Sequence, residues 1–464
     1  MRYVSTRNWA VEADFEKVVL SGLADDGGLY VPVELPHFSP QDIANWSTLA
    51  YDELAWRVLQ PFIGEAIAEA DLRPLLKAAC RGFSHRAIAP LHQVDRNEWV
   101  LELFHGPTGS SKDFAAQLQA QLVQHFLRKR QRRAVVLGAT NGDTGLAAIE
   151  AFKHCAEVDV VLLYPQTGVA PQQWQQLQAV NRPAVQRFAV NGSFDQCQTL
   201  VSQLFQQWPC ADALAVSFNS SNWVSVLAQL VFYFHAVLQL GGGQRPIGFS
   251  VPAASFAQVY AGYIAQKMGL PITQIIVATN QNDALHQLFL KNHYGRSQAN
   301  KTLSPAMDLS IFSNLERLLW ALYGRDGQAV SALMAGFEAS GDMRMANECW
   351  LQARMIIDSY AVSDAETVQE ISALYRDTGY VIDPHTATGV LAARLYRRSL
   401  VAPMVTLGEI APGKSAQLLG ELGIVLPVVP APRVEQGGDG ECRIEADDLH
   451  TLEQRVGALQ REAR

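Results

Sequence analysis

The chain has 464 residues, of which 48% are hydrophobic and 18% are charged, and its formal net charge is −8. This length exceeds what one hydrophobic core normally serves, so the sequence predicts two or three domains. The composition is that of an ordinary soluble globular protein, and the acidic balance argues against a broad basic surface for nucleic acid. The one basic run, residues 128–133, follows a helical pattern and is typical of a solvated helix C-terminus.

The cysteine pattern and the N-terminus indicate the compartment. The six cysteines form no CxxC pair and no zinc-ligand spacing, so neither a disulfide framework nor a metal site is expected. The first residues contain no apolar core of a signal peptide, and no stretch approaches the roughly 18 apolar residues of a membrane span. We therefore expect a cytoplasmic protein that binds neither membrane nor nucleic acid.

The first part of the chain is expected to form a small, mostly helical unit. A turn at residues 25–28, with the sequence Asp-Asp-Gly-Gly, precedes the apolar segment 29–32. Residues 51–63 then carry apolar side chains at helical spacing, which predicts a helix.

From about residue 98, short apolar strands alternate with amphipathic helices. This order predicts parallel sheets flanked by helices and connected by right-handed crossovers. The predicted strands are 99–104, 134–137, 158–163, 185–190, 213–217, 247–251 and 275–278. The predicted helices are 112–127, about 145–154, 194–207, 223–240 and 256–268.

The remainder of the chain carries fewer strand signals. Residues 282–376 are expected to be largely helical, and strands return at 405–407 and 424–428. Residues 434–442 include several charges and glycines, and they indicate a surface loop before a polar helical tail.

Three turns, each between a strand and the following helix, contain residues suited to an anion: 110–113, 140–145 and 252–256. Open parallel sheets bind ligands at the carboxyl ends of their strands, where helix N-termini present free N–H groups. Each turn alone is weak evidence, because Gly, Asn and Ser are also common in turns that bind nothing.

Lys112 stands at the start of the predicted helix 112–127, which is an unfavourable place for a cation. The helix N-terminus carries partial positive charge, so an ammonium there costs about 0.3–1 kcal/mol, whereas a neutral amine or an imine does not. The local residues alone also fit an ordinary solvated lysine after a Gly-Ser turn. Motifs elsewhere in the chain are needed to distinguish these two interpretations.

Ordered motifs cover nearly the whole chain. They are residues 5–7, 22–32, 105–108 with Lys112-Asp113, 142–145, Phe194-Asp195 with Cys197-Gln198, 219–223, 302–308 and 382–389. In this order they resemble the threonine synthase family, and specifically its longer microbial branch with an extra N-terminal domain.

The resemblance implies an α/β fold of the fold-type-II class of pyridoxal-phosphate (PLP) enzymes. Such a protein has two open parallel-sheet lobes and, in this branch, a small, mostly helical N-terminal domain. It divides the chain into an N-terminal domain over 1–82, a two-lobed catalytic domain over 83–432, and a C-terminal loop and helical tail over 433–464. The smaller lobe is expected at roughly 113–240.

By this resemblance Lys112 binds the cofactor, pyridoxal 5'-phosphate, covalently as an imine and later moves protons. The family converts O-phospho-L-homoserine and water to L-threonine and phosphate, with the cofactor as an electron sink. The implied partner is thus a small phosphorylated amino acid, and the chain is expected as a monomer or homodimer. The implied cofactor-binding residues are Lys112, Asn141, Asp143, Thr144, Ala254, Ser255, Phe256, Ala257, Gln258 and Glu409.

The turn that should hold the cofactor phosphate departs from the family pattern. Where the family has Gly-Asn-Phe-Gly-Asn, residues 254–258 of this chain read Ala-Ser-Phe-Ala-Gln. Glycine permits a positive φ and a close approach of backbone to phosphate, whereas an alanine forced into the left-handed region costs about 1–2 kcal/mol. We therefore expect either another turn shape or a weaker hold on phosphate.

A second departure is Glu409, which takes the place of the family's threonine that hydrogen-bonds the pyridine nitrogen. If Glu409 reaches that nitrogen, its carboxylate favours a protonated ring and a stronger electron sink. The alternative is a side chain turned to solvent. Two smaller departures are Ser111, in place of phenylalanine, and Asn141, in place of serine. His105 and His385 belong to kept motifs, and each fits a structural role as well as an acid–base role.

Two functions remain open after these departures. The first is a PLP-dependent lyase, either threonine synthase itself or a relative with a changed substrate or reaction. The second is a non-catalytic descendant that keeps the scaffold for binding or assembly. Retention of Lys112-Asp113 and of the 142–145 turn favours the enzyme, because a lysine at a helix N-terminus has little structural use. The altered 254–258 turn favours the second.

Overall fold

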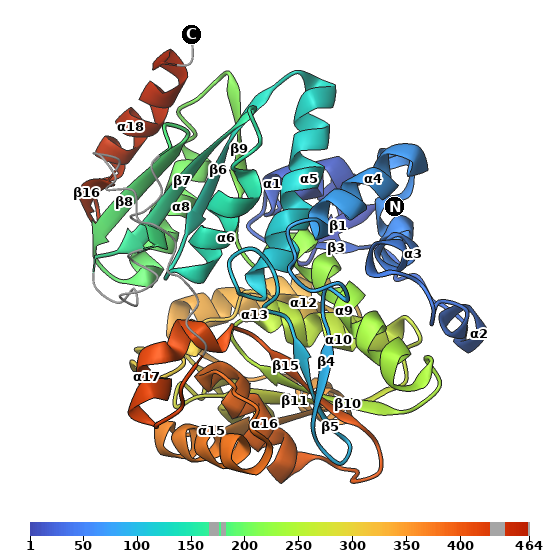
Figure 1. Cartoon of the computed structure of the whole chain (residues 1–464). Coiled ribbons are helices and arrows are strands. Elements are labelled where there is room, and N and C mark those ends of the chain that lie inside the picture. Colours follow the sequence, from blue (N-terminus) through green and yellow to red (C-terminus); the bar gives the residue numbers. More distant parts are fainter. Residues whose placement is uncertain (167–175, 178–181, 427–440, 463–464) are drawn as a thin grey trace.

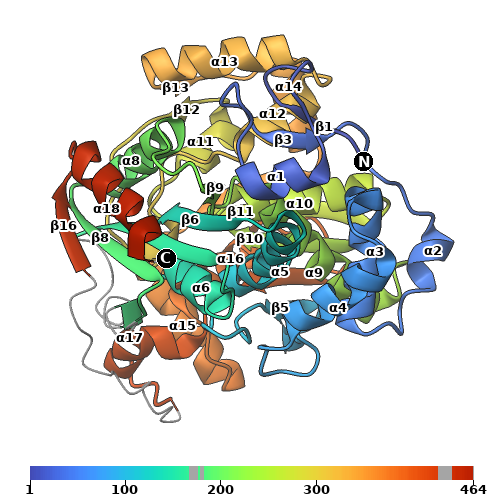
Figure 2. The same ribbon diagram turned by 90° about the horizontal axis from the view of Figure 1, so that it is seen from above.

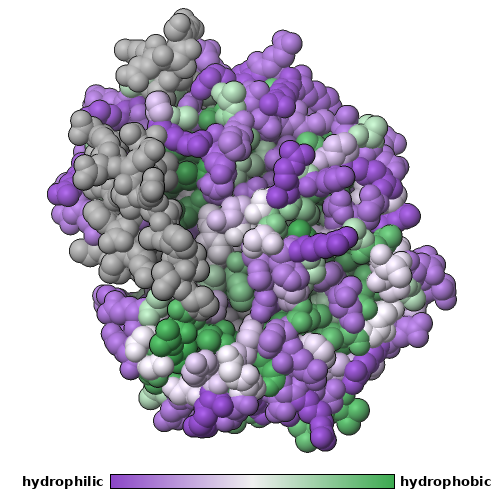
Figure 3. All heavy atoms as spheres, viewed as in Figure 1, coloured by the Kyte–Doolittle hydropathy of each residue, from purple (hydrophilic) through white to green (hydrophobic). Residues whose placement is uncertain are grey.

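The computed structural model describes residues 1–166, 176–177, 182–426 and 441–462, and it confirms an α/β fold. Two largely parallel sheets form two lobes, one above the other in Figure 1, and the N-terminal elements lie beside them. Figure 2 shows the same arrangement from above, with the C-terminal helix at the edge of the upper lobe. Polar side chains cover most of the face seen in Figure 3, and apolar areas lie between them.

The N-terminal part combines a small antiparallel sheet with short helices. Its elements are β1 (Tyr3–Ser5), β2 (Glu12–Ala13), α1 (Phe15–Ser21), β3 (Tyr30–Pro32), α2 (Pro40–Ala44), α3 (Tyr51–Ile63), η1 (Gly64–Ala66) and α4 (Glu69–Cys80). The sheet order is β2-β1-β3. Helix α1 begins after Asp14, whose side chain accepts a hydrogen bond from the Lys17 N–H, and Ser39 opens α2 with a capping box. The predicted helix over 51–63 is confirmed as α3.

The larger lobe contains a six-stranded sheet. Its strands are β4 (Leu91–Asp95), β5 (Glu98–Glu102), β10 (Ile247–Pro252), β11 (Ile272–Thr279), β14 (Ile357–Ala361) and β15 (Met404–Gly408). Their order is β14-β11-β10-β15-β5-β4, and all neighbours are parallel except β4 and β5, which form a hairpin. The carboxyl ends of β5, β15 and β10 therefore lie side by side at one edge of this sheet.

The smaller lobe contains a five-stranded parallel sheet. Its strands are β6 (Arg133–Ala139), β7 (Val158–Pro165), β8 (Val185–Asn191), β9 (Ala213–Ser217) and β16 (Glu441–Glu445), in the order β16-β8-β7-β6-β9. The segment 433–464, expected to be a loop and a helical tail, also contains a strand. This strand, β16, pairs with β8, and helix α18 (Leu449–Glu462) then packs on the same lobe. The smaller lobe thus draws on residues beyond 113–240. The domain limits at 82 and 432 stay predictions.

Helices connect and cover the two sheets. They are α5 (Lys112–Arg130), α6 (Asp143–Phe152), α8 (Phe194–Gln206), α9 (Trp223–Gly241), α10 (Phe256–Lys267), α11 (Ala284–Lys291), α12 (Leu315–Leu322), α13 (Gly327–Ser340), α14 (Asn347–Arg354), α15 (Asp364–Thr378), α16 (Pro384–Tyr396) and α17 (Ala416–Glu421). Short elements between them are β12 (Tyr294–Gly295), β13 (Asp342–Met343), η2 (Pro305–Met307) and η3 (Pro412–Ser415).

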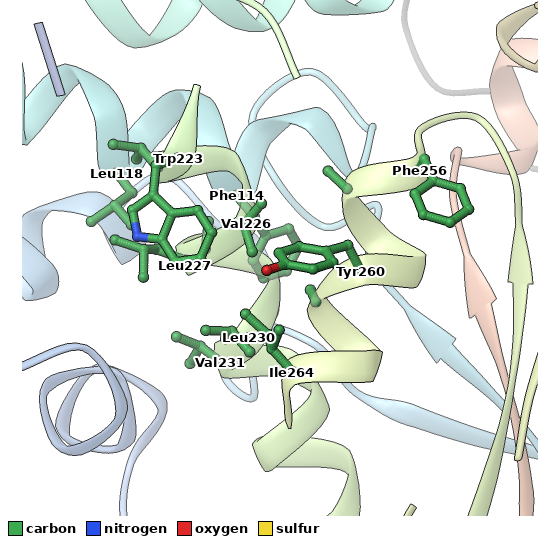
Figure 4. Close-up of a cluster of buried hydrophobic side chains, with 14 of the residues drawn as sticks. Phe114, Leu118, Trp223, Val226, Leu227, Leu230, Val231, Phe256, Tyr260 and Ile264 are labelled. Atoms are coloured by element: carbon green, nitrogen blue, oxygen red, sulfur yellow. The ribbon is translucent and has the colours of Figure 1, made fainter. Parts of the chain in front are cut away.

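The main core lies where α5, α9 and α10 pack together. Figure 4 shows Phe114 and Leu118 of α5 facing Trp223 and Leu227 of α9, with Tyr260 of α10 beside them. Burying a large apolar side chain contributes about 1.5–3 kcal/mol, so this contact fixes the start of α5 relative to the start of α10. Those two helix starts carry Lys112 and the 254–258 turn.

Helix α9 corrects one expectation from the sequence. It is long and apolar enough, by length and composition, to span a membrane, with a mean hydropathy of 1.6 over its most apolar window. However, 83% of that window is buried inside the protein. Its apolar character therefore serves the core between α5 and α10.

Two predicted features of the C-terminal half are also corrected. The strand predicted over 424–428 is absent over 424–426, where Val425 is 86% exposed, and 427–428 lie outside the described residues. The stretch 282–376 is largely helical, as expected, and it also contains the edge strand β14, which pairs with β11. Of the predicted loop over 434–442, only 441–442 are described, and they belong to β16.

Candidate active site

Three predicted site segments meet at the carboxyl edge of the larger sheet (Figure 1). Lys112 follows β5, Glu409 follows β15, and the 254–258 turn follows β10. Since β5, β15 and β10 are parallel neighbours, their following residues must emerge at the same edge. The strand order thus brings together residues that are up to about 300 positions apart.

Backbone hydrogen bonds lock the segment before Lys112 to the segment around Glu409. The Leu103 N–H donates to the Gly408 carbonyl at 2.9 Å, and the Ser111 N–H donates to the Glu409 carbonyl at 2.8 Å. Gly109 adopts a φ of 68°, which an L side chain rarely takes, and its carbonyl accepts from the Ala411 N–H at 3.0 Å. The start of α5 is therefore fixed to the end of β15.

Asp113 organises the loop from inside the first turn of α5. Its carboxylate accepts hydrogen bonds from the Thr108 N–H and the Thr108 hydroxyl, both at 2.9 Å. Burial raises the pKa of Asp113 to about 6, although these hydrogen bonds act in the opposite direction. Asp113 thus stabilises the loop that precedes Lys112. Lys112 itself is partly buried.

Glu409 turns inward, so the alternative of a solvent-facing side chain does not hold. Its residue is 1% exposed, and its carboxylate oxygens accept from the Ser111 hydroxyl at 2.6 Å and from Gln258 Nε2 at 2.5 Å. Burial raises the pKa of Glu409, while the Lys112 ammonium and these two hydrogen bonds oppose the rise. The structure therefore joins Glu409 to both other segments of this edge.

The 254–258 turn takes an ordinary shape with its alanines in place. Neither Ala254 nor Ala257 has a positive φ, so the expected cost of a left-handed alanine does not arise. The Ser255 side chain caps α10 by accepting from the Ala257 N–H, and Phe256 stacks on Phe289 in the core. The backbone N–H groups of Ser255 and Phe256 donate to no other described residue.

The 140–145 turn reaches the site from the smaller lobe. Gly142 has a φ of 138°, and Thr140 Oγ1 accepts from the N–H groups of Gly142 and Gly145 at 3.0 and 2.8 Å. Asp143 is buried and pairs through Oδ1 with Lys414, which belongs to η3 of the larger lobe. This pair joins the two lobes. Asp143 Oδ2 has no partner among the described residues.

The remaining predicted residues have clearer structural positions. Asn141 and Thr144 are partly buried on either side of Asp143, at the start of α6. His385 bonds through Nδ1 to Asp383 at 2.8 Å and accepts at Nε2 from the Ala306 N–H, which indicates a structural role. His105 Nε2 lies 2.6 Å from Glu102 Oε2, outside the group formed by Glu409.

Two members of this site were missed as site residues from the sequence, Ser111 and Lys414. Ser111 is visible only as a departure next to the lysine, and its contact with Glu409 spans 298 positions. Lys414 lies five residues after Glu409, and no spacing rule connects it to Asp143. Both contacts depend on how the strands are ordered in the sheets.

These groups suit a phosphorylated carbonyl cofactor. Lys112 supplies an amine, and the start of α10 supplies free N–H groups for a phosphate. The buried oxygens Gln258 Oε1 and Asp143 Oδ2 have no partner among the described residues, so polar atoms of a ligand can satisfy them. The residues present therefore fit pyridoxal phosphate.

The chain also matches known families along most of its length. Residues 2–80 match the family described as "Threonine synthase N terminus", and residues 84–407 match the family "Pyridoxal-phosphate dependent enzyme". The chain is 47% identical over 433 residues to the threonine synthase of Pseudomonas aeruginosa, covering 93% of this chain and 92% of that protein. It is 35% identical over 403 residues to threonine synthase-like 2 of Homo sapiens, covering 84% and 82%.

A solved structure supports the same relationship across the whole fold. The PLP-bound threonine synthase from Brucella melitensis superimposes with a TM-score of 0.92 and 39% sequence identity, and the match covers 99% of each chain.

Proposed function

The chain belongs to the threonine synthase family of pyridoxal-phosphate-dependent enzymes, and we propose that it converts O-phospho-L-homoserine and water to L-threonine and phosphate. The convergence of Lys112, Glu409 and the start of α10 at one sheet edge carries this proposal. An amine, a buried acid and free backbone donors occur there together.

Bound PLP supplies an electron sink that stabilises negative charge on the substrate carbons. The protein has to hold the cofactor, orient the substrate and move protons. We assign the covalent attachment and the proton movement to Lys112, the first residue of α5. Asp113 and the backbone bonds around Gly109 hold that lysine in place.

One helix start serves the cofactor phosphate, and a second one faces it from the other lobe. We assign the cofactor phosphate to the start of α10, where Ser255 and Phe256 offer free N–H groups to an anion. The turn with Asn141, Asp143 and Thr144, at the start of α6, faces the same junction from the other lobe. It supplies further polar contacts to the bound molecules, and the Asp143–Lys414 pair keeps it attached to the larger lobe.

Reconstitution with PLP tests this function directly. The purified chain is expected to develop a visible absorption band with PLP and to release phosphate from O-phospho-L-homoserine. Lys112→Ala is expected to lose both, whereas Lys129→Ala, at an exposed position of the same helix, keeps both. If the wild-type chain forms no band at high PLP concentration, the enzyme assignment fails and the non-catalytic alternative stands.

A related enzyme with a changed substrate or reaction is the second candidate. The observation that favours it is the buried contact of Glu409 with Ser111 and Gln258, all three of which depart from the family pattern. A normal cofactor band without phosphate release identifies this case.

We further propose that the enzyme works in the cytoplasm as a monomer or homodimer. The burial of its one strongly apolar helix, α9, among the described residues agrees with this setting. Light scattering of the purified chain measures the assembly.

A further inference from the structure

The buried contact of Ser111, Gln258 and Glu409, here called the Glu409 cluster, joins three turns of the larger lobe. Ser111 precedes α5, Gln258 lies in the first turn of α10, and Glu409 follows β15. Each carboxylate oxygen of Glu409 receives one hydrogen bond, from Ser111 Oγ at 2.6 Å and from Gln258 Nε2 at 2.5 Å. The three departures from the family pattern thus form one physical unit.

The cluster holds a buried acid without a cation in contact with it. Both hydrogen-bond donors are neutral, and Glu409 forms no ion pair with any described residue. Lys112 and His385 act on it only through longer-range charge interactions. Since a buried carboxylate is costly unless it is paired, Glu409 needs a cation from elsewhere to remain ionised.

The two donors are committed to orienting Glu409. Ser111 stands directly before α5, its side chain makes no capping bond to the helix, and its hydroxyl donates to Glu409. The Gln258 side-chain nitrogen is also occupied by Glu409, and the Gln258 backbone carbonyl accepts from the Tyr233 hydroxyl at 2.9 Å. Both side chains therefore fix where the carboxylate lies.

We propose that Glu409 is the counter-anion of a protonated pyridine nitrogen and that Ser111 and Gln258 are the positioning residues that hold it there. The inference rests on the proposed function, because it requires PLP in this site. A pyridine nitrogen is a weak base, and a proton on it supplies the positive charge that the cluster lacks.

Binding of a cofactor analogue tests the inference without measuring turnover. In this analogue a C–H group replaces the ring nitrogen of PLP, so it cannot carry the proton. A hydrogen bond between charged groups changes affinity by about tenfold or more, so the wild-type chain is expected to prefer PLP to the analogue by at least that factor. Glu409→Gln, which keeps the shape of the side chain, is expected to abolish the preference.

Nuclear magnetic resonance of PLP labelled with ¹⁵N in the ring provides the second measurement. The wild-type holoenzyme is expected to show the chemical shift of a protonated pyridine, and Glu409→Gln that of an unprotonated one. Ser111→Ala and Gln258→Leu are expected to lower the pH at which the ring loses its proton, and Ser111→Thr, which restores the hydroxyl, to return it.

Tyr233→Phe is the matched control for this measurement. It removes a buried hydrogen bond to the Gln258 backbone but leaves the Gln258 amide and Ser111 free to hold the carboxylate. It is expected to lower stability and to leave the ¹⁵N shift unchanged.

The outcomes separate the inference from the proposed function. A wild-type chain that binds PLP through Lys112 but shows an unprotonated ring overturns the inference alone. The same holds if wild type and Glu409→Gln discriminate equally between PLP and the analogue. A wild-type chain that binds neither compound overturns the proposed function and the inference with it.

Discussion

The turns that lead into α6 and α10 face the same junction from the two lobes, yet they hold their buried polar groups differently. In the turn before α6, Asp143 has a cation of the other lobe, Lys414, as its partner. In the turn before α10, Gln258 is an amide that donates to the buried carboxylate of Glu409. The buried acid of the first turn is thus paired with a cation of the protein, whereas that of the second has only neutral hydrogen-bond donors.

The two turns also differ in what their backbone requires. Gly142 has a φ of 138°, and a side chain on Gly145 would lie 2.7 Å from Thr140 Cγ2, so the first turn depends on glycine. The second turn has two alanines with ordinary φ values. A turn at a helix N-terminus therefore does not need glycine in general, and the need follows from the local path of the chain.

The largest expected effect tests the difference in charge. Lys414→Met leaves Asp143 buried without its cation, which is expected to destabilise the protein by about 3–5 kcal/mol. Glu409→Gln in the cofactor-free protein is expected to be neutral or stabilising, because it removes a buried acid that forms no ion pair in the described part of the chain. Urea unfolding at pH 7 measures both.

A double variant provides the control for this prediction. Asp143→Asn combined with Lys414→Met removes both charges, so most of the lost stability is expected to return. Equal losses in Lys414→Met and Glu409→Gln would show that the two carboxylates are held in the same way.

A second prediction extends the comparison to Asp113, whose direct hydrogen-bond donors, like those of Glu409, are neutral. Burial raises its pKa from 3.8 in the unfolded chain to about 6 in the folded state. Between pH 4 and pH 6 the folded state therefore keeps a proton that the unfolded state has lost, and the free energy of unfolding falls as the pH rises. Relative to Asp113→Asn, wild type is expected to lose on the order of 3 kcal/mol across this range.

Unfolding of both proteins at several pH values measures this difference. Titration of all other groups is common to the two proteins and cancels. Parallel pH profiles would contradict the prediction and would mean that Asp113 ionises as it does in water.

A third prediction tests the backbone requirement of the turn before α6. Gly142→Ala forces an L residue to a φ of 138°, which is expected to cost about 1–3 kcal/mol. Gly420→Ala is the control, because Gly420 lies in helix α17 with no atom near the added Cβ, and this change is expected to be neutral or stabilising. Thermal unfolding of the two variants distinguishes a conformational cost from a general effect of added methyl groups.

The sequence predicted the elements with strong local patterns, and it missed those that depend on distant neighbours. Helices α5, α9 and α10 follow from apolar periodicity and strands β6 to β9 from their apolar runs, because burial imposes those patterns locally. Strands β14 and β16 are edge strands, and they form because they pair with β11 and β8, respectively.

The same limit applies to the candidate site. The family resemblance singled out Lys112 and Glu409, but the contacts of Glu409 span 298 and 151 positions and could not be read from any local pattern. For the 254–258 turn the sequence left two outcomes open, another turn shape or a weaker hold on phosphate. The cost of a left-handed alanine applied only to the conformation of a glycine turn, whereas the structure places Ala257 inside the first turn of α10 with no positive φ.

The smallest expected effect tests that last point. If the turn before α10 has no need of glycine, Ala254→Gly with Ala257→Gly is expected to leave the affinity for PLP unchanged. It is also expected to lower stability by about 1 kcal/mol, because Ala257 lies in a helix, where glycine is less favourable than alanine. Titration of PLP by absorbance and urea unfolding measure the two quantities separately. Tighter PLP binding in the glycine variant would contradict the comparison, because it would show that both helix starts at this junction depend on glycine to approach a phosphate.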